Sequence, residues 1–139
     1  MRIEEFSHDD SNERFWAKMG PHFASPAVRN AVGGFMTSGP QFTWWVAIDD
    51  SEQVMGFCAA KKEKAGAQVY LTYAYTLPDY RGQGVYTALF AARLNAVLLW
   101  LGVRRLYAVC SAASLPMLLA HNFVPCGQRG HFIVVERML

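Results

Sequence analysis

Residues 75–87 read Tyr75-Thr76-Leu77-Pro78-Asp79-Tyr80-Arg81-Gly82-Gln83-Gly84-Val85-Tyr86-Thr87, and they lead from a strand-like run through a glycine-containing loop into a helix-like run. Glycine lets the backbone of such a loop turn tightly and approach a ligand with no Cβ in the way. The first turn of the helix adds unpaired N–H groups and the positive end of the helix dipole. The stretch therefore predicts a pocket in which backbone amides bind phosphate oxygens without a cluster of lysines.

This loop differs from two common phosphate-binding motifs. The P-loop pattern GxxxxGK[ST] is absent from the sequence. The dinucleotide-binding pattern GxGxxG is not met either, because Gly82-Gln83-Gly84 lacks the third glycine and follows what reads as an antiparallel meander. The loop is therefore either a phosphate-binding loop of another kind or an ordinary glycine-containing entry into a helix.

The segment before the loop predicts one strand, two helices and a meander of three strands. The first helix opens with Asp10 and Glu13, a capping-box pair, and closes at Gly20-Pro21. The second opens at Ser25-Pro26, an N-cap followed by a first-turn proline, and ends at Gly33-Gly34. The strands are expected at Met1 to Phe6, Phe42 to Ile48, Val54 to Ala60 and Gln68 to Leu77, with charged turns at Asp49 to Glu52 and Lys61 to Gly66.

The segment after the loop predicts a crossover helix and a parallel strand. Gly84 to Leu101 has no strong helix breaker, and Gly102 stops the element. The remaining elements are a strand at Val103 to Cys110, a short helix from Ser114 to a left-handed Asn122, and two strands in Phe123 to Met138 broken at Gly127 to Gly130. The order β-α-α-β-β-β-α-β-α-β-β predicts an α/β (α+β) fold, with a mixed, mostly antiparallel sheet of about seven strands flanked by about four helices.

Composition bounds the kind of protein. The 139 residues are 53% apolar and 17% charged, which predicts one folded domain over residues 1–139 and excludes disorder. Thirteen basic and eleven acidic residues give a net charge of +2, which argues against nucleic acid as a partner. An anionic ligand held at one local site remains compatible with this charge.

Cysteine and histidine positions predict neither a disulfide scaffold nor a metal site. Cys58, Cys110 and Cys126 are an odd number without CxxC spacing, and the four histidines are far apart. Cys110 has no histidine at a recognisable spacing, so a buried apolar cysteine is expected there. The N-terminus lacks the apolar run of a signal peptide, and the apolar stretch from Ala96 to Val103 is too short to cross a membrane. These observations favour a cytoplasmic protein with no membrane partner.

The loop resembles the acyl-CoA loop of the GCN5-related N-acetyltransferase (GNAT) family, written [Q/R]-x-x-G-x-[G/A]. Arg81 and Gly84 fit this pattern, whereas Tyr86 stands where the family usually has glycine or alanine and would crowd the pyrophosphate side. The resemblance extends to the element order and to the C-terminal part. There it rests on Val103 to Val109 as the fifth strand, on Ser114-Leu115-Pro116-Met117 as the N-x-P-M helix start, and on Asn122-Phe123-Val124-Pro125 as the G-F-x-P segment.

This resemblance implies a single acyl-CoA N-acyltransferase domain over 1–139, with acetyl-CoA as co-substrate and no metal. It implies transfer of an acetyl group to a primary amine of a small molecule or peptide, by direct attack in a ternary complex. The pantetheine arm would add between the splayed fourth and fifth strands, and a backbone N–H near Thr76 would polarise the thioester carbonyl. The implied cofactor-binding residues are Tyr75, Thr76, Leu77, Arg81, Gly82, Gln83, Gly84, Val85, Tyr86, Thr87 and Ser114.

The catalytic groups are less well defined by the resemblance. Many relatives have a glutamate on the fourth strand and a tyrosine on the fourth helix, but Gln68 to Leu77 contains no acid and no tyrosine lies after Ala108. Tyr73 is a candidate to hold a proton-relaying water, or else an aromatic of the core. His121 is a candidate acid for the leaving thiolate, or else a capping residue at the end of a helix.

Two readings of function stay open at this point. The first is the N-acetyltransferase, whose acceptor pocket the family builds from its most variable segments, here roughly Phe15 to Phe42. The second is a catalytically silent acyl-CoA-binding or interaction domain, which the absence of the usual acid and tyrosine motivates. The resemblance leaves a homodimer open as the assembly.

Overall fold

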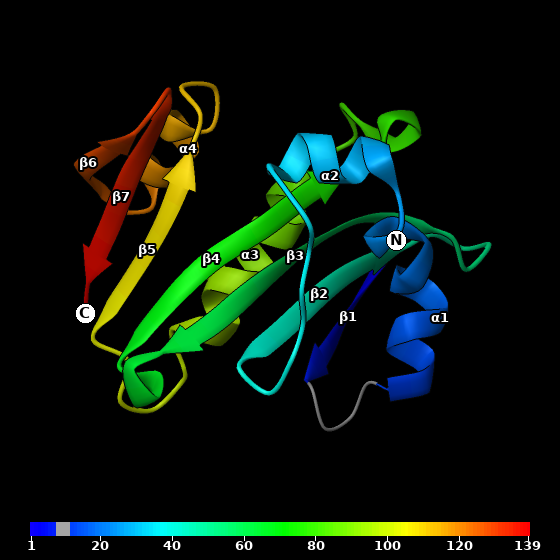
Figure 1. Ribbon diagram of the computed structural model, residues 1–139, viewed down its shortest axis with the longest axis horizontal. Helices are drawn as coiled ribbons and strands as arrows, with labels where there is room; N and C mark the ends of the chain where they lie inside the picture. The colour runs from blue at the N-terminus through cyan, green and yellow to red at the C-terminus, as the bar shows by residue number, and fades with distance from the viewer. Residues whose placement is uncertain (8–11) are drawn as a thin grey trace.

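The computed structural model describes residues 1–7 and 12–139. Within these residues it contains one seven-stranded sheet, in the order β1-β2-β3-β4-β5-β7-β6, and four α-helices (Figure 1). The strands are β1 (Arg2–Ser7), β2 (Phe42–Ile48), β3 (Val54–Glu63), β4 (Gln68–Thr76), β5 (Arg105–Cys110), β6 (Val124–Arg129) and β7 (Phe132–Met138). The helices are α1 (Asn12–Phe23), α2 (Pro26–Val32), α3 (Val85–Val97) and α4 (Leu115–Ala120), with short 3-10 turns η1 (Lys64–Gly66) and η2 (Pro78–Tyr80).

The predicted fold class and element order are confirmed. In the described part of the chain only β4 and β5 pair in parallel, and α3 is the crossover between them. Such a connection needs a helix-sized segment, because parallel neighbours start at the same end of the sheet.

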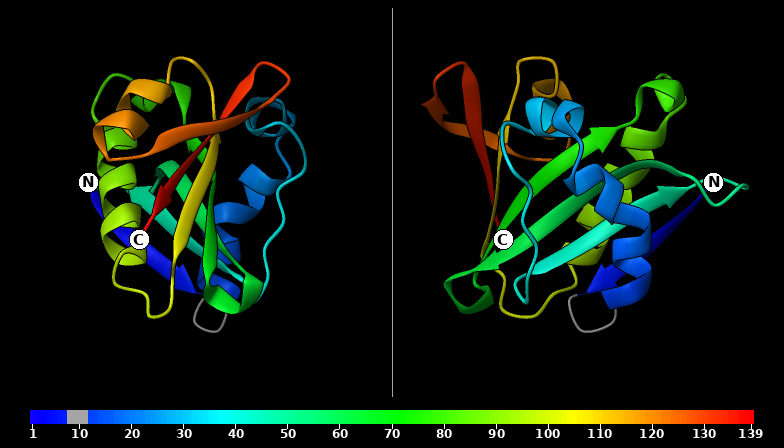
Figure 2. Two further views of the ribbon diagram at one scale, coloured as in Figure 1. Left: turned by 90° about the vertical axis from the view of Figure 1, so that its left-hand side faces the viewer. Right: turned by 45° about the vertical axis from the view of Figure 1, so that its right-hand side comes forward.

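The helices lie on both faces of the sheet (Figure 2). On one face, α3 and α4 pack against inward-facing residues of β2 to β5. On the other face, α1 and α2 cover β1 to β4 with an aromatic cluster. Trp44 and Trp45 belong to opposite clusters, as adjacent residues of a strand must.

Local cap chemistry sets several element ends as the sequence predicts. The Ser25 hydroxyl accepts the Val28 N–H at the start of α2, and Gly33 closes that helix at φ 88°. Asn122 follows α4 at φ 68°, the left-handed conformation that asparagine tolerates. The capping box predicted from Asp10 lies outside the described residues.

The predicted end of the first helix at Gly20-Pro21 is wrong. α1 continues through Pro21 to Phe23, although proline removes one helical hydrogen bond. The Phe23 ring packs against Trp16 at 4.8 Å and Trp44 at 5.3 Å between centroids, so aromatic burial holds the last turn in place.

Two further boundaries differ from the sequence-based expectation. α3 ends at Val97 rather than Leu101, because the chain tightens into i→i−3 bonds that bring Trp100 onto Trp45, at 6.3 Å between ring centroids. β3 extends into the predicted charged turn, because Lys61, Lys62 and Glu63 pair with the start of β4. None of the helices described combines the length and the apolar character needed to cross a membrane.

Candidate active site

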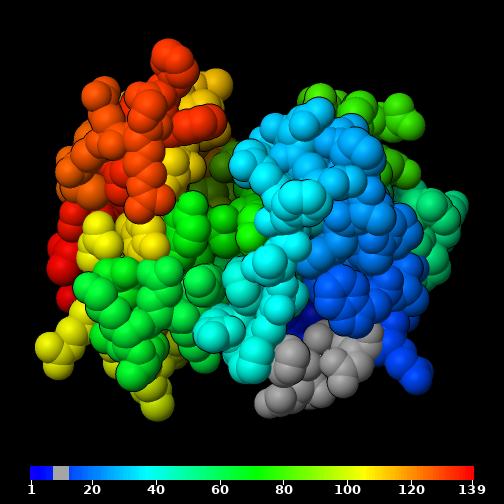
Figure 3. All heavy atoms as spheres, in the orientation of Figure 1, coloured from blue at the N-terminus to red at the C-terminus, as the bar shows by residue number. Residues whose placement is uncertain are grey.

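The two parallel strands separate in the middle of the sheet. β4 and β5 pair from Gln68↔Arg105 to Leu71↔Ala108, and beyond that point β4 continues to Thr76 without β5 beside it. Figure 1 shows the strands diverging towards their C-terminal ends, and Figure 3 shows a hollow between the β5–β7 part and α2. The separation leaves one edge of β4 free to pair with an added extended chain.

A β-bulge lies on β4 where the separation begins. The β3–β4 register shifts between Phe57 and Ala59, and Tyr73 adopts φ 55° there. A bulge leaves carbonyl groups out of the ladder. Arg93 of α3 is only 4% exposed and donates from Nη1 to the carbonyls of Ala59 at 3.1 Å and Thr72 at 3.2 Å. Arg93 therefore stabilises the backbone shape of the bulge from beneath the sheet.

The register beyond the bulge sets which backbone groups face the cleft. The Leu77 N–H donates to the Met55 carbonyl at 2.9 Å, so Leu77 points its N–H towards β3. Tyr75, two residues earlier on a regular strand, does the same. Thr76 lies between them and directs its N–H into the cleft. Tyr75, Thr76 and Leu77 are expected to hold the pantetheine arm. Of these three residues, only Thr76 has its N–H on the cleft side of β4.

The glycine loop closes the upper end of the cleft. Gly82 and Gly84 adopt φ 76° and φ 81°, a left-handed conformation that costs a residue with a Cβ about 1–2 kcal/mol. The loop and the first turn of α3 surround a cavity of about 240 Å³. Its lining residues are Thr76, Tyr80, Arg81, Gly82, Gly84, Val85, Tyr86 and Thr87. The structure thus brings together seven of the residues predicted to bind the cofactor, and adds Tyr80.

Side-chain contacts hold this loop to its neighbours. The Tyr80 hydroxyl donates to Asp49 Oδ2 at 2.7 Å, and Arg81 Nε donates to the Thr76 carbonyl at 3.0 Å. The Arg81 guanidinium also lies 5.5 Å from the centre of the Tyr75 ring. Hydrogen bonds from the Gln53 N–H and then from Tyr80 lower the pKa of Asp49. These contacts therefore anchor the N-terminal side of the loop to the β2–β3 turn and to the end of β4.

The cavity fits a diphosphate. The first N–H groups of α3, from Val85 onward, have no partner within the helix, and Arg81 supplies a positive charge beside them. Thr76 Oγ1 is buried without a hydrogen-bond partner among the described residues, so a polar ligand atom would satisfy it. These donors match the phosphate oxygens of an acyl-CoA and the polar groups of its arm.

Tyr86 and Ser114 meet across the cleft. The Tyr86 hydroxyl lies close to Ser114 at the start of α4, and the ring lies 6.3 Å from Phe90. Burial raises the pKa of Tyr86, so this phenol stays protonated at neutral pH. Tyr86 thus places an aromatic ring, which extends towards α4, at the position where the family pattern has glycine or alanine. Gln83 turns back instead, and its Nε2 donates to the Asp79 carbonyl at 3.2 Å.

The two catalytic candidates lie on different faces of the sheet. Tyr73 stacks on Trp44 at 5.6 Å between centroids, and its hydroxyl accepts the Thr37 N–H at 3.4 Å. His121 ends α4, with its ring 4.8 Å from Phe90. His121 Nδ1 lies 2.8 Å from the Met117 carbonyl, so the ring carries a proton on Nδ1 and leaves Nε2 available.

The cysteines carry no sign of activation. Cys58 and Cys110 are buried, and burial raises the pKa of both thiols. Cys126 is exposed, and all three cysteines are free. Among the described residues, no three side chains of histidine, cysteine, aspartate or glutamate gather as a metal-binding group.

The comparison with known families identifies the class of protein. A model of the acetyltransferase (GNAT) family matches residues 3–123. The chain therefore belongs to the GNAT acetyltransferase family and is an N-acetyltransferase of that type. No protein of curated function matches the chain by sequence.

Solved structures share the fold at low sequence identity. An acyl-CoA N-acyltransferase from Pseudomonas aeruginosa is 19% identical with a TM-score of 0.75, covering 98% of both chains. NAA60 from Arabidopsis thaliana, solved with a bisubstrate analogue, is 16% identical with a TM-score of 0.69, covering 99% of this chain and 98% of that one. N-acetylglutamate synthase from Neisseria gonorrhoeae, complexed with coenzyme A and L-arginine, is 14% identical with a TM-score of 0.66. That match covers 99% of this chain and 33% of the synthase.

Two residues of the site were missed at the sequence level. Arg93 is the one charged residue of α3, whose other residues are mostly apolar, and such an isolated charge is a signal of a buried polar role. Tyr80 belongs to the quoted stretch, but its partner Asp49 lies 31 residues earlier, and no local pattern links the two.

Proposed function

We propose that this chain transfers an acetyl group from acetyl-CoA to a primary amine of a small molecule or peptide, by direct attack in a ternary complex. The observation that carries the proposal is the 240 Å³ loop cavity at the upper end of the cleft between β4 and β5. Acetyl-CoA supplies the activated acetyl group, and residues 1–139 act as one acyl-CoA N-acyltransferase unit.

The loop residues have a binding role in this proposal. Arg81 and the amides from Val85 to Thr87 bind the diphosphate. Gly82 and Gly84 allow the loop backbone to approach it, and Ser114 with the Tyr86 hydroxyl borders the path of the arm. The Thr76 N–H acts as the donor at the oxygen where negative charge develops, a role that backbone amides perform without reorganisation.

The acceptor is expected to enter from the face that carries α1 and α2. Residues between α2 and β2 reach the bulge there, through the contact of Thr37 with Tyr73. This supports an acceptor pocket built within Phe15 to Phe42, beside the separated strands. N-acetylglutamate synthase, complexed with coenzyme A and L-arginine, illustrates a small-molecule substrate class on this fold.

Proton transfer is assigned to two candidates. The amine must lose a proton, because an alkyl ammonium has a pKa near ~10. β4 contains no carboxylate, so a water held by Tyr73 is the proposed relay. His121 is the proposed acid for the thiolate. Because its Nδ1 proton is bound to the Met117 carbonyl, the proton it gives must come from a charged ring at Nε2.

Release of free CoA over a panel of amines and peptides tests the proposal. Chromatographic detection of CoA is preferable to thiol reagents, because Cys126 is an exposed free thiol. Tyr73→Phe and His121→Gln should each lower kcat by about tenfold or more if they transfer protons, with little change in acetyl-CoA affinity. Binding of acetyl-CoA without release across a broad panel would favour the silent acyl-CoA-binding domain.

A further inference from the structure

A second cavity, of about 920 Å³, lies at the opposite end of β4 from the glycine loop. The α3–β5 connection forms one wall, and the end of β3 with η1 forms the other. β4 runs from Gln68 to Thr76, so at about 3.3 Å per residue the two cavities are roughly 26 Å apart. This groove is therefore separate from the acetyl-transfer site.

The wall formed by β3 and η1 is cationic. Lys61, Lys62 and Lys64 line the groove, and among the described residues none of them has a carboxylate within ion-pair distance. Glu63 is the acid among the lining residues, but its carboxylate is already hydrogen-bonded to side chains of the sheet. Its Oε1 accepts hydrogen bonds from Tyr107 Oη at 2.7 Å and Gln68 Nε2 at 2.8 Å. Lys61 Nζ lies 5.8 Å from the centre of the Phe42 ring, on the other face of the sheet from Trp100, so Lys62 and Lys64 supply the charge for a ligand beside the apolar wall.

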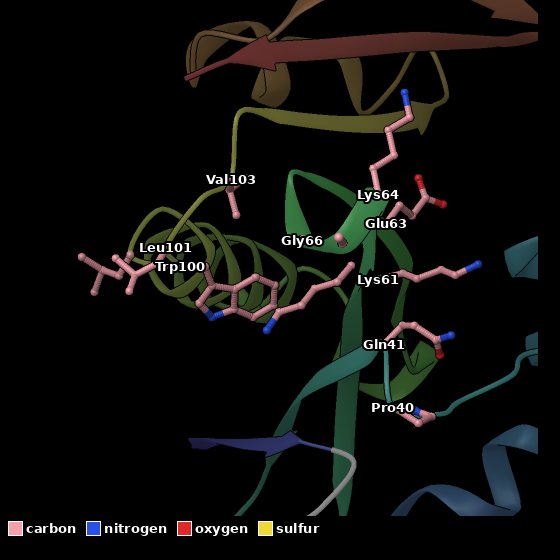
Figure 4. Close-up of a pocket in the computed structure, with 12 residues that line it drawn as sticks. Pro40, Gln41, Lys61, Glu63, Lys64, Gly66, Trp100, Leu101 and Val103 are labelled. Carbon is pink, nitrogen blue, oxygen red and sulfur yellow. The ribbon is translucent and has the colours of Figure 1, made fainter.

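The wall formed by the α3–β5 connection is apolar and open to solvent. Leu99 is 82% exposed and Leu101 is 98% exposed. Trp100 is half-buried between them, with Lys62 Nζ 4.5 Å from its ring centre. Figure 4 shows Trp100, Leu101 and Val103 on one side of the groove, while Lys61 and Lys64 extend away from them on the other. An apolar floor with a charged rim is the usual anatomy of a protein interface.

We propose that this groove, which we call the lysine–leucine groove, binds an acidic segment of a partner protein that carries a leucine-sized anchor between aspartates or glutamates. The anchor would lie against Leu99, Trp100 and Leu101, and the acids would pair with the lysines at the rim. A small ligand within the groove would leave Leu101 in water, whereas an extended chain covers it. A flat membrane surface would not fill the concave part beside Trp100.

Fluorescence anisotropy with labelled peptides and the full chain tests this inference. The probes are a glutamate–leucine peptide, its lysine–leucine counterpart and its glutamate–serine counterpart. The glutamate–leucine peptide should bind about tenfold or more tightly than either counterpart. The double variants Lys62→Glu/Lys64→Glu and Leu99→Ser/Leu101→Ser should each weaken it by a similar factor. Both leucines are largely exposed, so the second double variant should fold normally.

Matched controls separate the groove from general surface effects. Arg129→Glu makes the same kind of charge reversal on the exposed β6, and Leu139→Ser removes another half-exposed leucine. Both should bind the glutamate–leucine peptide like wild type, and thermal unfolding should be alike in all variants. These readouts do not depend on acetyl transfer.

Several results would overturn the inference. Equal affinity for the glutamate–leucine and lysine–leucine peptides would do so, as would wild-type affinity in the groove variants. Sedimentation that shows a dimer lost only in Leu99→Ser/Leu101→Ser would assign the groove to a second copy of the chain. Retention on phosphatidylserine vesicles, with no peptide binding, would assign it to a membrane surface.

Discussion

Tyr86 stands where the acyl-CoA loop of the family usually carries glycine or alanine. Its ring packs near Phe90, and its hydroxyl reaches Ser114 on the other side of the cleft. A side chain in this place narrows the path between the loop cavity and the separated strands. We therefore expect Tyr86 to limit the room for the cofactor beside the amides proposed to bind it.

We expect Tyr86→Ala to tighten acetyl-CoA binding by about three- to tenfold, because the ring no longer crowds the cofactor. The same change should lower the free energy of unfolding by about 1–2 kcal/mol through lost burial. Calorimetry and denaturant unfolding measure the two effects separately. Tyr86→Phe is the control, since it keeps the ring and should bind like wild type. Weaker binding by Tyr86→Ala would mean that the ring contacts the cofactor instead.

At the scale of elements, the packing of α3 on β3 and β4 shapes the cleft. Gly56 of β3 lies where an added Cβ would be 2.8 Å from the Tyr75 carbonyl and 3.2 Å from Val85. A separation under about 3 Å is shorter than any unstrained carbon–oxygen contact. A residue without a side chain therefore allows α3 and the end of β4 to approach closely behind the glycine loop.

Gly56→Ala should destabilise the protein by about 1–3 kcal/mol, because backbone rather than a flexible side chain blocks the methyl group. It should also weaken acetyl-CoA binding by moving the β4 end relative to α3. Denaturant unfolding and calorimetry report the two effects. Gly127→Ala is the matched control on β6, where the new Cβ would meet Val134 at an ordinary 3.9 Å. Equal stability of the two variants would contradict this account.

Arg93 joins α3 to the β-bulge through two carbonyl groups. Arg93→Met should leave those carbonyls unpaired in the core and cost about 2–4 kcal/mol of unfolding free energy. If the bulge positions the Thr76 N–H, kcat should fall more than the affinity for acetyl-CoA at a temperature where the variant is folded. Arg93→Lys should recover part of the stability but not the two-carbonyl geometry. A variant with unchanged kcat would limit Arg93 to a structural role.

Sequence-based prediction succeeds where the interaction is local. Ser25, Gly33 and Asn122 set element ends through groups within a few residues, and the loop from Arg81 to Thr87 is one contiguous motif. Sequence-based prediction fails where residues far away in the chain determine the end of an element or the role of a side chain. α1 passes Pro21 because Phe23 packs against Trp44, and the roles of Arg93 and Tyr80 depend on residues 34 and 31 positions earlier.

At the scale of the whole molecule, a charge network ties the N-terminal strand to α1 and the β2–β3 turn. Glu52 accepts hydrogen bonds from Arg2 at 2.7 Å and Lys18 at 3.2 Å, and Glu4 pairs with Arg2 and Arg14. The hydrogen bonds from Arg2 and then Lys18 lower the pKa of Glu52 to about 2. A lowered pKa in the folded state means that ionised Glu52 favours folding.

This contribution should be complete above about pH 4.5, the ordinary range of a glutamate, and should disappear as the pH falls towards 2. Glu52→Gln should therefore lower Tm near neutral pH, with a difference that shrinks below pH 4.5. Because the pairs are exposed, the Tm difference should also shrink in high salt. Thermal unfolding at several pH values measures it. A difference that stays constant down to pH 2 would contradict the assigned ion pairs.

The two proposed sites of the molecule lie at opposite ends of β4. The glycine loop and the cleft lie at one end, and the lysine–leucine groove lies at the other. In such an arrangement a partner held at the groove does not obstruct the cleft.

Calorimetric titration of acetyl-CoA into the wild-type chain and Gly84→Glu tests the central claim most directly. The substitution places a side chain on a left-handed residue and a negative charge beside the amides at the start of α3. We expect wild type to bind acetyl-CoA and Gly84→Glu to bind it at least about tenfold more weakly while remaining folded. Absence of binding to wild type at high micromolar acetyl-CoA, or equal binding by a folded Gly84→Glu, would contradict the assignment of this loop as the acyl-CoA site.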